Sequence, residues 1–283
     1  MLAAILATGS SFAWGCADFT AGVTCRRLGL ITVLFVSQLV GMILLIPVLT
    51  ASGQASPDLS SWGLGALAGV FNAAALTAFY RGLSRGSISI VASIAATEAL
   101  IPVAFGLLHG EQPSAIGTIG IVLALAGVIV AAGAANNADG AGKASRTSVW
   151  LGVVAAVCFG LFVVALRGAS QEGGGLWAAA VSRGSTIALL AAVMPAARAN
   201  FTLKLRGVDV AAVLGVGVLD VAANIMLALA TRSGAISTVG VLSSFYPVVT
   251  MVLAGVVLRE RLGKLQRLGT IGALAGAVLI AAR

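Results

Sequence analysis

Charged residues are scarce in this chain of 283 amino acids, where Asp, Glu, Lys and Arg together make up only 9%. A soluble domain has about a quarter of its residues charged, so water is not the main solvent of this protein. The 17 Lys and Arg outnumber the 9 Asp and Glu, but they fall between long apolar runs, whereas a nucleic-acid interface gathers its bases on a polar surface. The composition therefore indicates a protein of the lipid bilayer and argues against nucleic acid as a partner.

Cysteine and histidine are also rare. The three cysteines have no metal-binding spacing, and their odd number argues against a disulfide framework. A single histidine, His109, excludes a multi-histidine metal or haem site, and neither a P-loop nor an HExxH motif occurs. We therefore expect no metal, no cofactor and no enzyme activity.

The chain repeats one pattern with a spacing of 148 or 149 residues. Glycines and glutamates held in register carry this repeat, because matches among Ala, Val and Leu arise easily by chance in an apolar chain. The pairs include Gly69 with Gly217, Gly86 with Gly234, Glu111 with Glu260, Gly120 with Gly269, and Gly127 with Gly276. The pattern predicts two copies of one structural unit.

Ten apolar runs are long enough to cross a bilayer, which takes about 20 residues in a helix. Runs of this length without alternation are helices, because no water bonds an open backbone inside the membrane. The runs are Leu2–Gly22, Leu30–Leu49, Trp62–Tyr80, Ile88–Leu108, Ile116–Ala132, Val149–Leu166, Leu176–Pro195, Val210–Leu229, Ile236–Leu258 and Leu268–Ala282. The sequence thus predicts an all-α integral membrane protein with a first five-helix repeat over residues 1–133, a polar linker over 134–147 and a second five-helix repeat over 148–283.

Basic residues mark one side of the predicted membrane protein. The loops after the odd-numbered runs hold 13 Lys and Arg, whereas only Arg167, Arg232 and Arg283 fall on the other side. The positive-inside rule therefore predicts cytoplasmic odd-numbered loops and both termini outside. The basic loops follow odd-numbered helices of the first half and even-numbered helices of the second, so the halves are predicted to be inverted-topology repeats, which are typical of transporters.

Four charged residues fall inside the predicted spans: Asp18, Glu98, Arg183 and Asp220. Each costs about 2.5–3.5 kcal/mol at a helix centre, so each is expected to face a cavity or a partner. The repeat matches Gln38 with Arg183, Asn72 with Asp220, and Glu98 with Tyr246, while Asn224 shares a helix face with Asp220. We predict that these residues, apart from Asp18, meet between the two halves and bind the substrate.

The roles of the charged residues stay open at this point. Arg183 could hold a carboxylate or phosphate of the substrate, or it could form a structural ion pair with one acid. Glu98, Asp220 and Asp18 are candidates for coupling, since an acid without a base needs a proton, an ion or a substrate. Glu98 is the strongest single candidate, whereas Asp18 is expected at the interface or at a helix end.

Prolines and glycines add two further expectations. Pro102 and Pro247 are expected to kink the fourth and ninth spans and to free the carbonyls of Glu98 and Ser243 beside the polar cluster. Small-residue stripes in the fifth and tenth spans predict close packing, either between the halves or between two molecules of a homodimer.

The sequence resembles the drug/metabolite transporter (DMT) superfamily, in particular its ten-helix EamA-type members. The resemblance rests on GSSFAWG at 9–15 followed by Asp18, on Gly86-Ser-Ile-Ser to Gly110-Glu111, and on Ser243-Ser-Phe-Tyr-Pro247 to Leu258-Arg-Glu-Arg-Leu262. It implies alternating access for a small organic solute such as an amino acid, a metabolite or a drug-like compound, often in the outward direction. Well-studied members are thought to keep both termini in the cytoplasm, which differs from the charge bias of this chain.

The resulting prediction is a secondary transporter in the cytoplasmic (plasma) membrane that crosses it many times, with a small-molecule substrate and proton coupling. One alternative is a membrane-embedded enzyme or flippase acting on a lipid-linked substrate, which would need a nucleophile and a base in the cavity. A channel is the other alternative, and it would need a continuous polar stripe along several helices.

Overall fold

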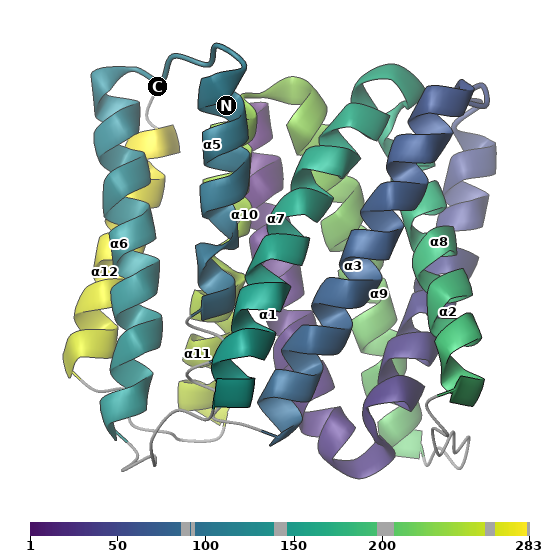
Figure 1. Cartoon of the computed structure of the whole chain (residues 1–283), viewed down its shortest axis with the longest axis horizontal. Coiled ribbons are helices and arrows are strands. Elements are labelled where there is room, and N and C mark those ends of the chain that lie inside the picture. Colours follow the sequence, from purple (N-terminus) through teal and green to yellow (C-terminus); the bar gives the residue numbers. More distant parts are fainter. Residues whose placement is uncertain (86–90, 92–93, 139–145, 197–206, 258–263, 282–283) are drawn as a thin grey trace.

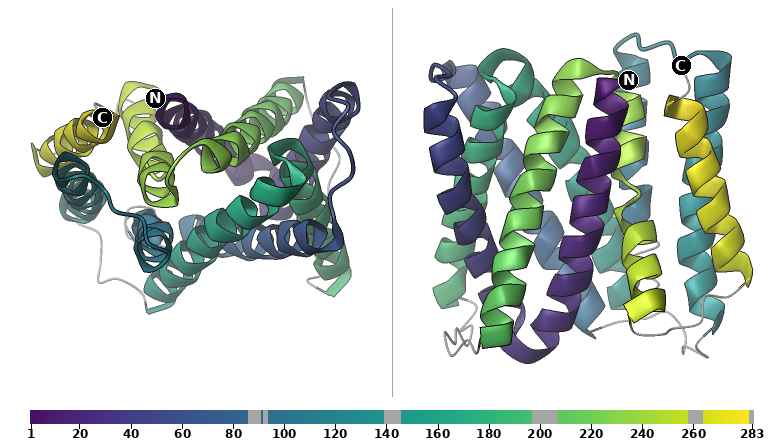
Figure 2. Two further views of the ribbon diagram at one scale, coloured as in Figure 1. Left: turned by 90° about the horizontal axis from the view of Figure 1, so that it is seen from above. Right: turned by 180° about the vertical axis from the view of Figure 1, so that it is seen from behind.

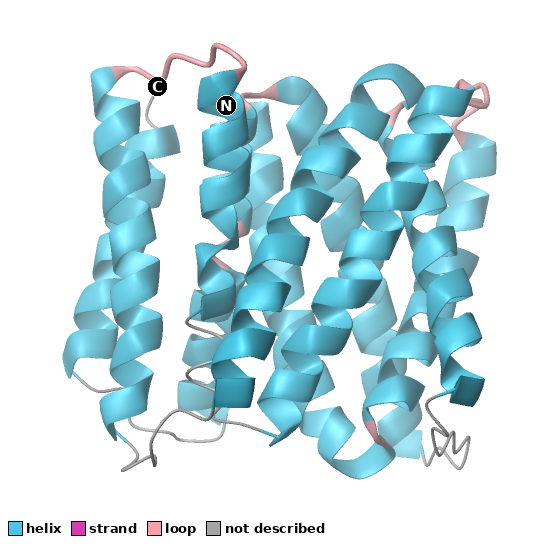
Figure 3. Ribbon diagram, viewed as in Figure 1, coloured by secondary structure: helices cyan, strands magenta, loops and turns pink. Residues whose placement is uncertain are grey.

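The structure is a computed structural model that describes residues 1–85, 91, 94–138, 146–196, 207–257 and 264–281. The described residues are almost entirely helical and contain no strand, as Figure 3 shows. In a helix the backbone N–H and C=O groups hydrogen-bond to one another. A bilayer requires this, because lipid offers these groups no hydrogen-bond partner.

Two sets of helices follow one another along the chain. The first set is α1 (Leu2–Leu28), α2 (Leu30–Ala51), α3 (Leu59–Arg85), the short 3₁₀ helix η1 (Ala96–Ala99), α5 (Leu100–Leu108) and α6 (Ala115–Ala138). The second set is α7 (Arg146–Gly173), α8 (Gly175–Ala196), α9 (Gly207–Ser233), α10 (Ile236–Ser243), α11 (Tyr246–Val257) and α12 (Lys264–Ala281).

Six helices of the described residues are long and apolar enough to cross a membrane, namely α1, α2, α3, α7, α8 and α9. Three shorter apolar segments, Ala96–Leu108, Ala115–Gly127 and Ile236–Thr250, add to them. The prediction of ten complete spans is therefore not confirmed in full. The fourth and ninth predicted spans are interrupted helices, and this shortens their continuous apolar length.

Large apolar side chains cover the outside of the helix bundle. Phe12 on α1, Ile43 on α2 and Ile119 on α6 are 61%, 66% and 59% exposed, and many Val, Leu and Ile side chains on the other helices are exposed as well. An apolar surface of this extent is unstable in water, and it fits a lipid environment.

The two sets of helices pack on each other symmetrically. In the first half α3 lies against α7 and α8, and in the second half the equivalent helix α9 lies against α1 and α2. The last helices of the two halves, α6 and α12, form a pair of their own at one end of the bundle, as both views of Figure 2 show. Exchanging the halves reproduces this packing, which is the two-repeat architecture expected from the sequence.

Glycines make the same close approach in both halves. A Cβ atom on Gly15 of α1 would lie 2.8 Å from the Tyr246 carbonyl oxygen, and one on Gly160 of α7 would lie 2.7 Å from the Glu98 carbonyl oxygen. Real Cβ atoms do not come so close, so α1 and α7 need glycine where the interrupted helices cross them. These contacts fix the backbone at Glu98 and Tyr246.

Glu111 joins the two halves at another point. Its Oε1 accepts a hydrogen bond from the backbone N–H of Ile236 at 2.6 Å, and its Oε2 accepts one from Ser237 at 3.1 Å. The carboxylate therefore satisfies two N–H groups that the start of α10 leaves free. Arg167 lies 3.9 Å from Glu111 Oε1 and donates to the Gly234 carbonyl at 3.0 Å. The matching glutamate, Glu260, lies outside the described residues.

We expect Gly276→Ala to separate α12 from α6. A Cβ atom on Gly276 would lie 2.7 Å from both Ala124 Cα and the Gly120 carbonyl oxygen, and these backbone atoms cannot rotate away. Overpacking of this kind costs about 1–3 kcal/mol, so the apparent melting temperature of the purified protein should fall. Gly272→Ala is the matched control, since its Cβ would lie 3.6 Å from Gly127 Cα in ordinary contact. Equal melting temperatures for the two variants would contradict this packing.

Candidate functional site

One cavity opens between the two halves of the described structure. Helices α1, α2, α3, α7, α9 and α11 and the 3₁₀ helix η1 all contribute to its wall. Its polar lining residues are Asp18, Ser37, Gln38, Asn72, Glu98 and Asp220, and its aromatic lining residues are Trp14, Tyr80, Phe159, Phe162 and Tyr246. A concave site lined mainly by apolar groups, with a few polar groups in it, is typical of small-molecule binding.

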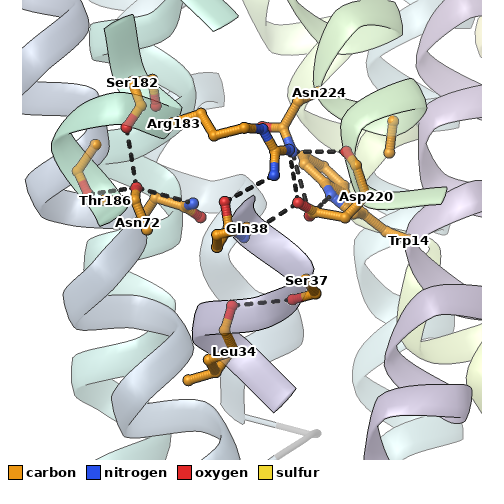
Figure 4. A network of polar contacts seen from close by, with 12 residues as sticks. Trp14, Leu34, Ser37, Gln38, Asn72, Ser182, Arg183, Thr186, Asp220 and Asn224 are labelled. Atoms are coloured by element: carbon orange, nitrogen blue, oxygen red, sulfur yellow. Dashed lines mark hydrogen bonds and ion pairs between the residues drawn. The ribbon is translucent and has the colours of Figure 1, made fainter. Parts of the chain in front are cut away.

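Arg183 and Asp220 form a buried ion pair beside this cavity (Figure 4). Arg183 Nη2 lies 2.7 Å from Asp220 Oδ2, and Arg183 Nη1 donates to Gln38 Oε1 at 2.8 Å. Gln38 Nε2 in turn donates to Asp220 Oδ2 at 3.1 Å. The three side chains come from α8, α9 and α2, so the network connects both halves of the chain.

The Asp220 carboxylate has further donors. Trp14 Nε1 donates to Oδ1 at 3.2 Å, and Asn224 Nδ2 donates to the same oxygen at 3.2 Å and to the Asp220 carbonyl at 2.8 Å. Four side chains thus satisfy one carboxylate. Arg183 is only 3% exposed and is not part of the cavity lining, and its Nε is buried without a hydrogen-bond partner among the described residues. This geometry matches the structural ion pair, the second of the two roles considered for Arg183.

Glu98 has a different environment. It lies in η1 with 4% of its surface exposed, and Tyr246 Oη donates to Glu98 Oε2 at 3.1 Å. Within the described part of the chain it forms no salt bridge. A buried carboxyl group without a base beside it is costly in a membrane protein, and it is therefore a strong candidate for a functional group.

Asp18 is the second such carboxyl group in the cavity. Tyr80 Oη donates to Asp18 Oδ1 at 2.5 Å, and Asp18 also lacks a salt bridge among the described residues. The residue lies ten positions before the end of α1 and lines the cavity. The expectation of an interfacial or helix-end position for Asp18 is therefore wrong, because the residue lies well inside α1 and its side chain faces the cavity, where it bonds Tyr80.

Equivalent positions of the two repeats touch each other in this site. Gln38 is bonded to Arg183, its match at a separation of 145 residues. Glu98 is bonded to Tyr246, its match at a separation of 148 residues. Residues that meet their own equivalents lie on the axis that relates the two halves, so this axis runs through the candidate site.

Asn72 completes the set of predicted site residues. It lines the cavity from α3, and its Nδ2 lies 3.5 Å from Thr186 Oγ1 on α8. Thr186 Oγ1 is itself within 3.0 Å of the Gly69 and Ser182 carbonyls. The cavity therefore receives a polar group from α3 that is held across the boundary between the halves.

Both interrupted helices break just before their prolines. Glu98 belongs to the 3₁₀ turn that precedes α5, and Pro102 follows inside α5. In the second half α10 ends at Ser243, and Pro247 is the second residue of α11. A proline cannot donate to the carbonyl four residues earlier, and the interruptions bring Glu98 and Tyr246 into the cavity wall.

The sequence prediction included Tyr246 but missed the other aromatic residues of the cavity, Tyr80, Trp14, Phe159 and Phe162. The chain has only two tyrosines, and both donate to a carboxylate of the cavity, so their rarity was an available signal. Trp14 also belongs to the site, where its Nε1 donates to Asp220. Among the described residues no three His, Cys, Asp or Glu side chains gather as a metal site.

A membrane protein of two packed helical repeats, with its charged groups around one central cavity, has the architecture of a transporter. The family model described as the EamA-like transporter family matches residues 1–133 and 146–282, so the chain belongs to this family of the DMT superfamily. The chain is accordingly a multi-pass membrane protein of a transporter family.

Solved structures agree on the fold. One crystal structure, described only as that of a protein, superimposes with a TM-score of 0.77 at 18% identity and covers 99% of this chain and 96% of its own. At that identity the likeness shows the fold alone. A comparison with curated proteins gives no match.

Proposed function

We propose that this protein is a secondary transporter that moves a small organic solute across the cytoplasmic membrane by alternating access, with export as its direction. The observation that carries the proposal is the cavity between the two halves, where Asp18 and Glu98 lie without a salt bridge among the described residues. Groups this costly in a bilayer mark substrate and ion pathways.

The proposal includes ten transmembrane helices in two inverted repeats, with boundaries at 1–133, 134–147 and 148–283. In Figure 1, α1, α3 and α6 run downward, whereas their equivalents α7, α9 and α12 run upward. The start of α1 and the end of α12 lie at the upper edge. The positive-inside rule places that edge outside the cell. The homodimer stays a prediction. The glycines of α12 that suggested it, Gly272 and Gly276, lie against α6 of the same chain and so give it no support.

The substrate-binding set of this proposal is narrower than the sequence alone suggested. Glu98, Tyr246, Asn72 and Asp18 face the solute, whereas Arg183, Asp220, Gln38 and Asn224 hold the halves together around it. A proton would be exchanged at Glu98 or Asp18, because Arg183 already neutralises Asp220 at 2.7 Å. Binding of solute and proton to the same carboxyl groups would couple their movements.

An enzyme has less support. Residues 82–86 read Gly-Leu-Ser-Arg-Gly, which has the spacing of a hydrolase nucleophile elbow. That elbow is a turn from a strand into a helix, whereas Gly82 and Ser84 lie within α3. A flippase or channel would need a polar path to lipid or through the bundle, whereas the polar groups of this cavity are flanked by apolar rings and side chains.

Counterflow in proteoliposomes tests the carrier. Vesicles loaded with unlabelled solute should accumulate the same labelled solute transiently, and initial rates should saturate with concentration. The panel is L-phenylalanine, phenethyltrimethylammonium, 3-phenylpropanoate and N,N-dimethyl-3-phenylpropanamide, each with and without a proton gradient. Protein-free vesicles are the control. Linear, non-saturating flux would indicate a channel, and no protein-dependent flux for any member of the panel would overturn the proposal.

A further inference from the structure

We propose that the transported solute is an organic cation with an aromatic or bulky apolar body and without a carboxylate. This inference rests on the proposed function, and it assigns the substrate class of the same cavity. It follows from the charges that the cavity presents, from the charge that it lacks, and from the rings in its wall.

The free charges of the cavity are acidic. Asp18 and Glu98 line it from α1 and η1, and among the described residues neither is paired with a base. Each carboxylate accepts one hydrogen bond from a tyrosine, Tyr80 or Tyr246. A phenol orients a carboxylate but does not neutralise it, so a positive group that enters the cavity gains two opposite charges.

The cavity offers no site for an anion. Its described lining includes no Lys, Arg or His. Arg183 is the base of the polar network beside the cavity. One of its terminal nitrogens donates to Asp220 and the other donates to Gln38. A carboxylate or phosphate on the solute would therefore face acids without a base to bind it, and this disfavours zwitterionic amino acids as well as anions.

Aromatic rings surround the same space. The Trp14 and Phe162 ring centroids are 6.3 Å apart, Trp14 and Tyr246 are 6.4 Å apart, and Phe159 and Tyr246 are 6.3 Å apart. Aromatic faces attract quaternary and aromatic ammonium groups, and they also cover an apolar body. A wall of rings with two free acids thus matches a cation whose charge is attached to an apolar skeleton.

Equilibrium binding to the purified full-length protein in nanodiscs tests this class. The probe is tritiated phenethyltrimethylammonium, whose charge does not change with pH. Three competitors keep its phenyl ring but change the charge: N,N,N-trimethylphenylalanine is zwitterionic, N,N-dimethyl-3-phenylpropanamide is neutral and 3-phenylpropanoate is anionic. We expect saturable binding of the cation, with each competitor at least about tenfold weaker, the scale of one lost charge-assisted contact.

Two variants remove one charge each. Glu98→Gln and Asp18→Asn should each weaken binding of phenethyltrimethylammonium at least about tenfold, while the affinity for the neutral amide stays unchanged. Asp58→Asn is the control, because Asp58 is an exposed acid outside the cavity that bonds the start of α3, and asparagine preserves this cap. The competitor ranking of the unmodified protein needs no variant, so poor folding of a variant leaves the test intact.

The failures of the two proposals differ. Saturable counterflow of L-phenylalanine or 3-phenylpropanoate without that of the cation would overturn the substrate class and leave the carrier in place. A zwitterionic competitor that matches the cation would also overturn the class. Absence of protein-dependent flux across the whole panel would overturn the carrier itself.

Discussion

Replacing Arg183 by alanine is expected to destabilise the folded protein by about 3–5 kcal/mol, because the change leaves the buried Asp220 carboxylate without its counter-charge. The pair is 2.7 Å apart, and Arg183 also bonds Gln38, so the ion pair within the second half and a hydrogen bond across the halves are lost together. The apparent melting temperature in detergent and the monodispersity on size exclusion measure the effect.

A double variant is the control for this prediction. Arg183→Met with Asp220→Asn removes both charges and keeps the side-chain volumes, so it should recover most of the lost stability. If Arg183→Ala keeps the melting temperature of the unmodified protein but loses solute binding, the arginine holds the solute. That result would reverse the assignment of Arg183 to a structural role.

Replacing Glu98 by glutamine is expected to reduce transport on the order of a hundredfold while the protein stays folded. The amide fills the same space and its oxygen still accepts the Tyr246 hydrogen bond, which is 3.1 Å long in the carboxylate form. The variant loses the only acid of η1. With this carboxyl group it loses the charge that binds a cation and the group that exchanges a proton. Initial rates of counterflow, normalised to protein inserted in the vesicles, measure the loss.

Tyr246→Phe separates the charge of Glu98 from its hydrogen bond. This variant keeps the carboxyl group and loses one neutral hydrogen-bond donor, so we expect the initial rate of transport to fall only a few-fold. The residual flux through Glu98→Gln also separates the two candidate proton groups: it should lose its dependence on a proton gradient where Glu98 exchanges the proton, and keep it where Asp18 does. Full transport by Glu98→Gln would remove Glu98 from the site.

The repeat could be predicted from the sequence because glycines and polar residues recur in it at a fixed spacing. An apolar composition alone does not produce such matches by chance. Gly69 and Gly217 match in sequence, and each lies close to a backbone carbonyl of the opposite half. Gly69 packs against the carbonyl of Ser182, and Gly217 packs against the carbonyl of Ser37. The spacing of 145 residues likewise connects Gln38 with Arg183, which the structure brings into contact. Equivalence in the sequence thus located the centre of the molecule.

The hydrogen-bond and ion-pair partners of the buried acids could not be predicted from the sequence in the same way. Asp18 on α1 bonds Tyr80 on α3 within one half, and position 228, which matches Tyr80, is an alanine. No repeat signal marks such a contact. The choice between the two roles of Arg183 depended on which of its nitrogens were already occupied, and a one-dimensional pattern does not contain that information.

Continuity of the predicted spans was the other point at which sequence reasoning failed. A hydropathy window averages over Ala96–Ala99 and over the turn at Ser244, because small and polar side chains there are outnumbered by apolar neighbours. The prolines indicated where the breaks would lie, but the length of the regular helix on each side depends on tertiary packing against α7 and α1.

The contacts between equivalent residues on the axis also bear on how such a molecule can be assembled. Two copies of the first half alone would set Glu98 opposite Glu98 and Gln38 opposite Gln38, and two copies of the second would set Arg183 opposite Arg183. Fusion into one polypeptide lets each axial position hold two unlike side chains, an acid with a phenol and a guanidinium with an amide. Neither half can therefore build this centre with its own duplicate, and separately expressed halves should function only when both are present in the same membrane.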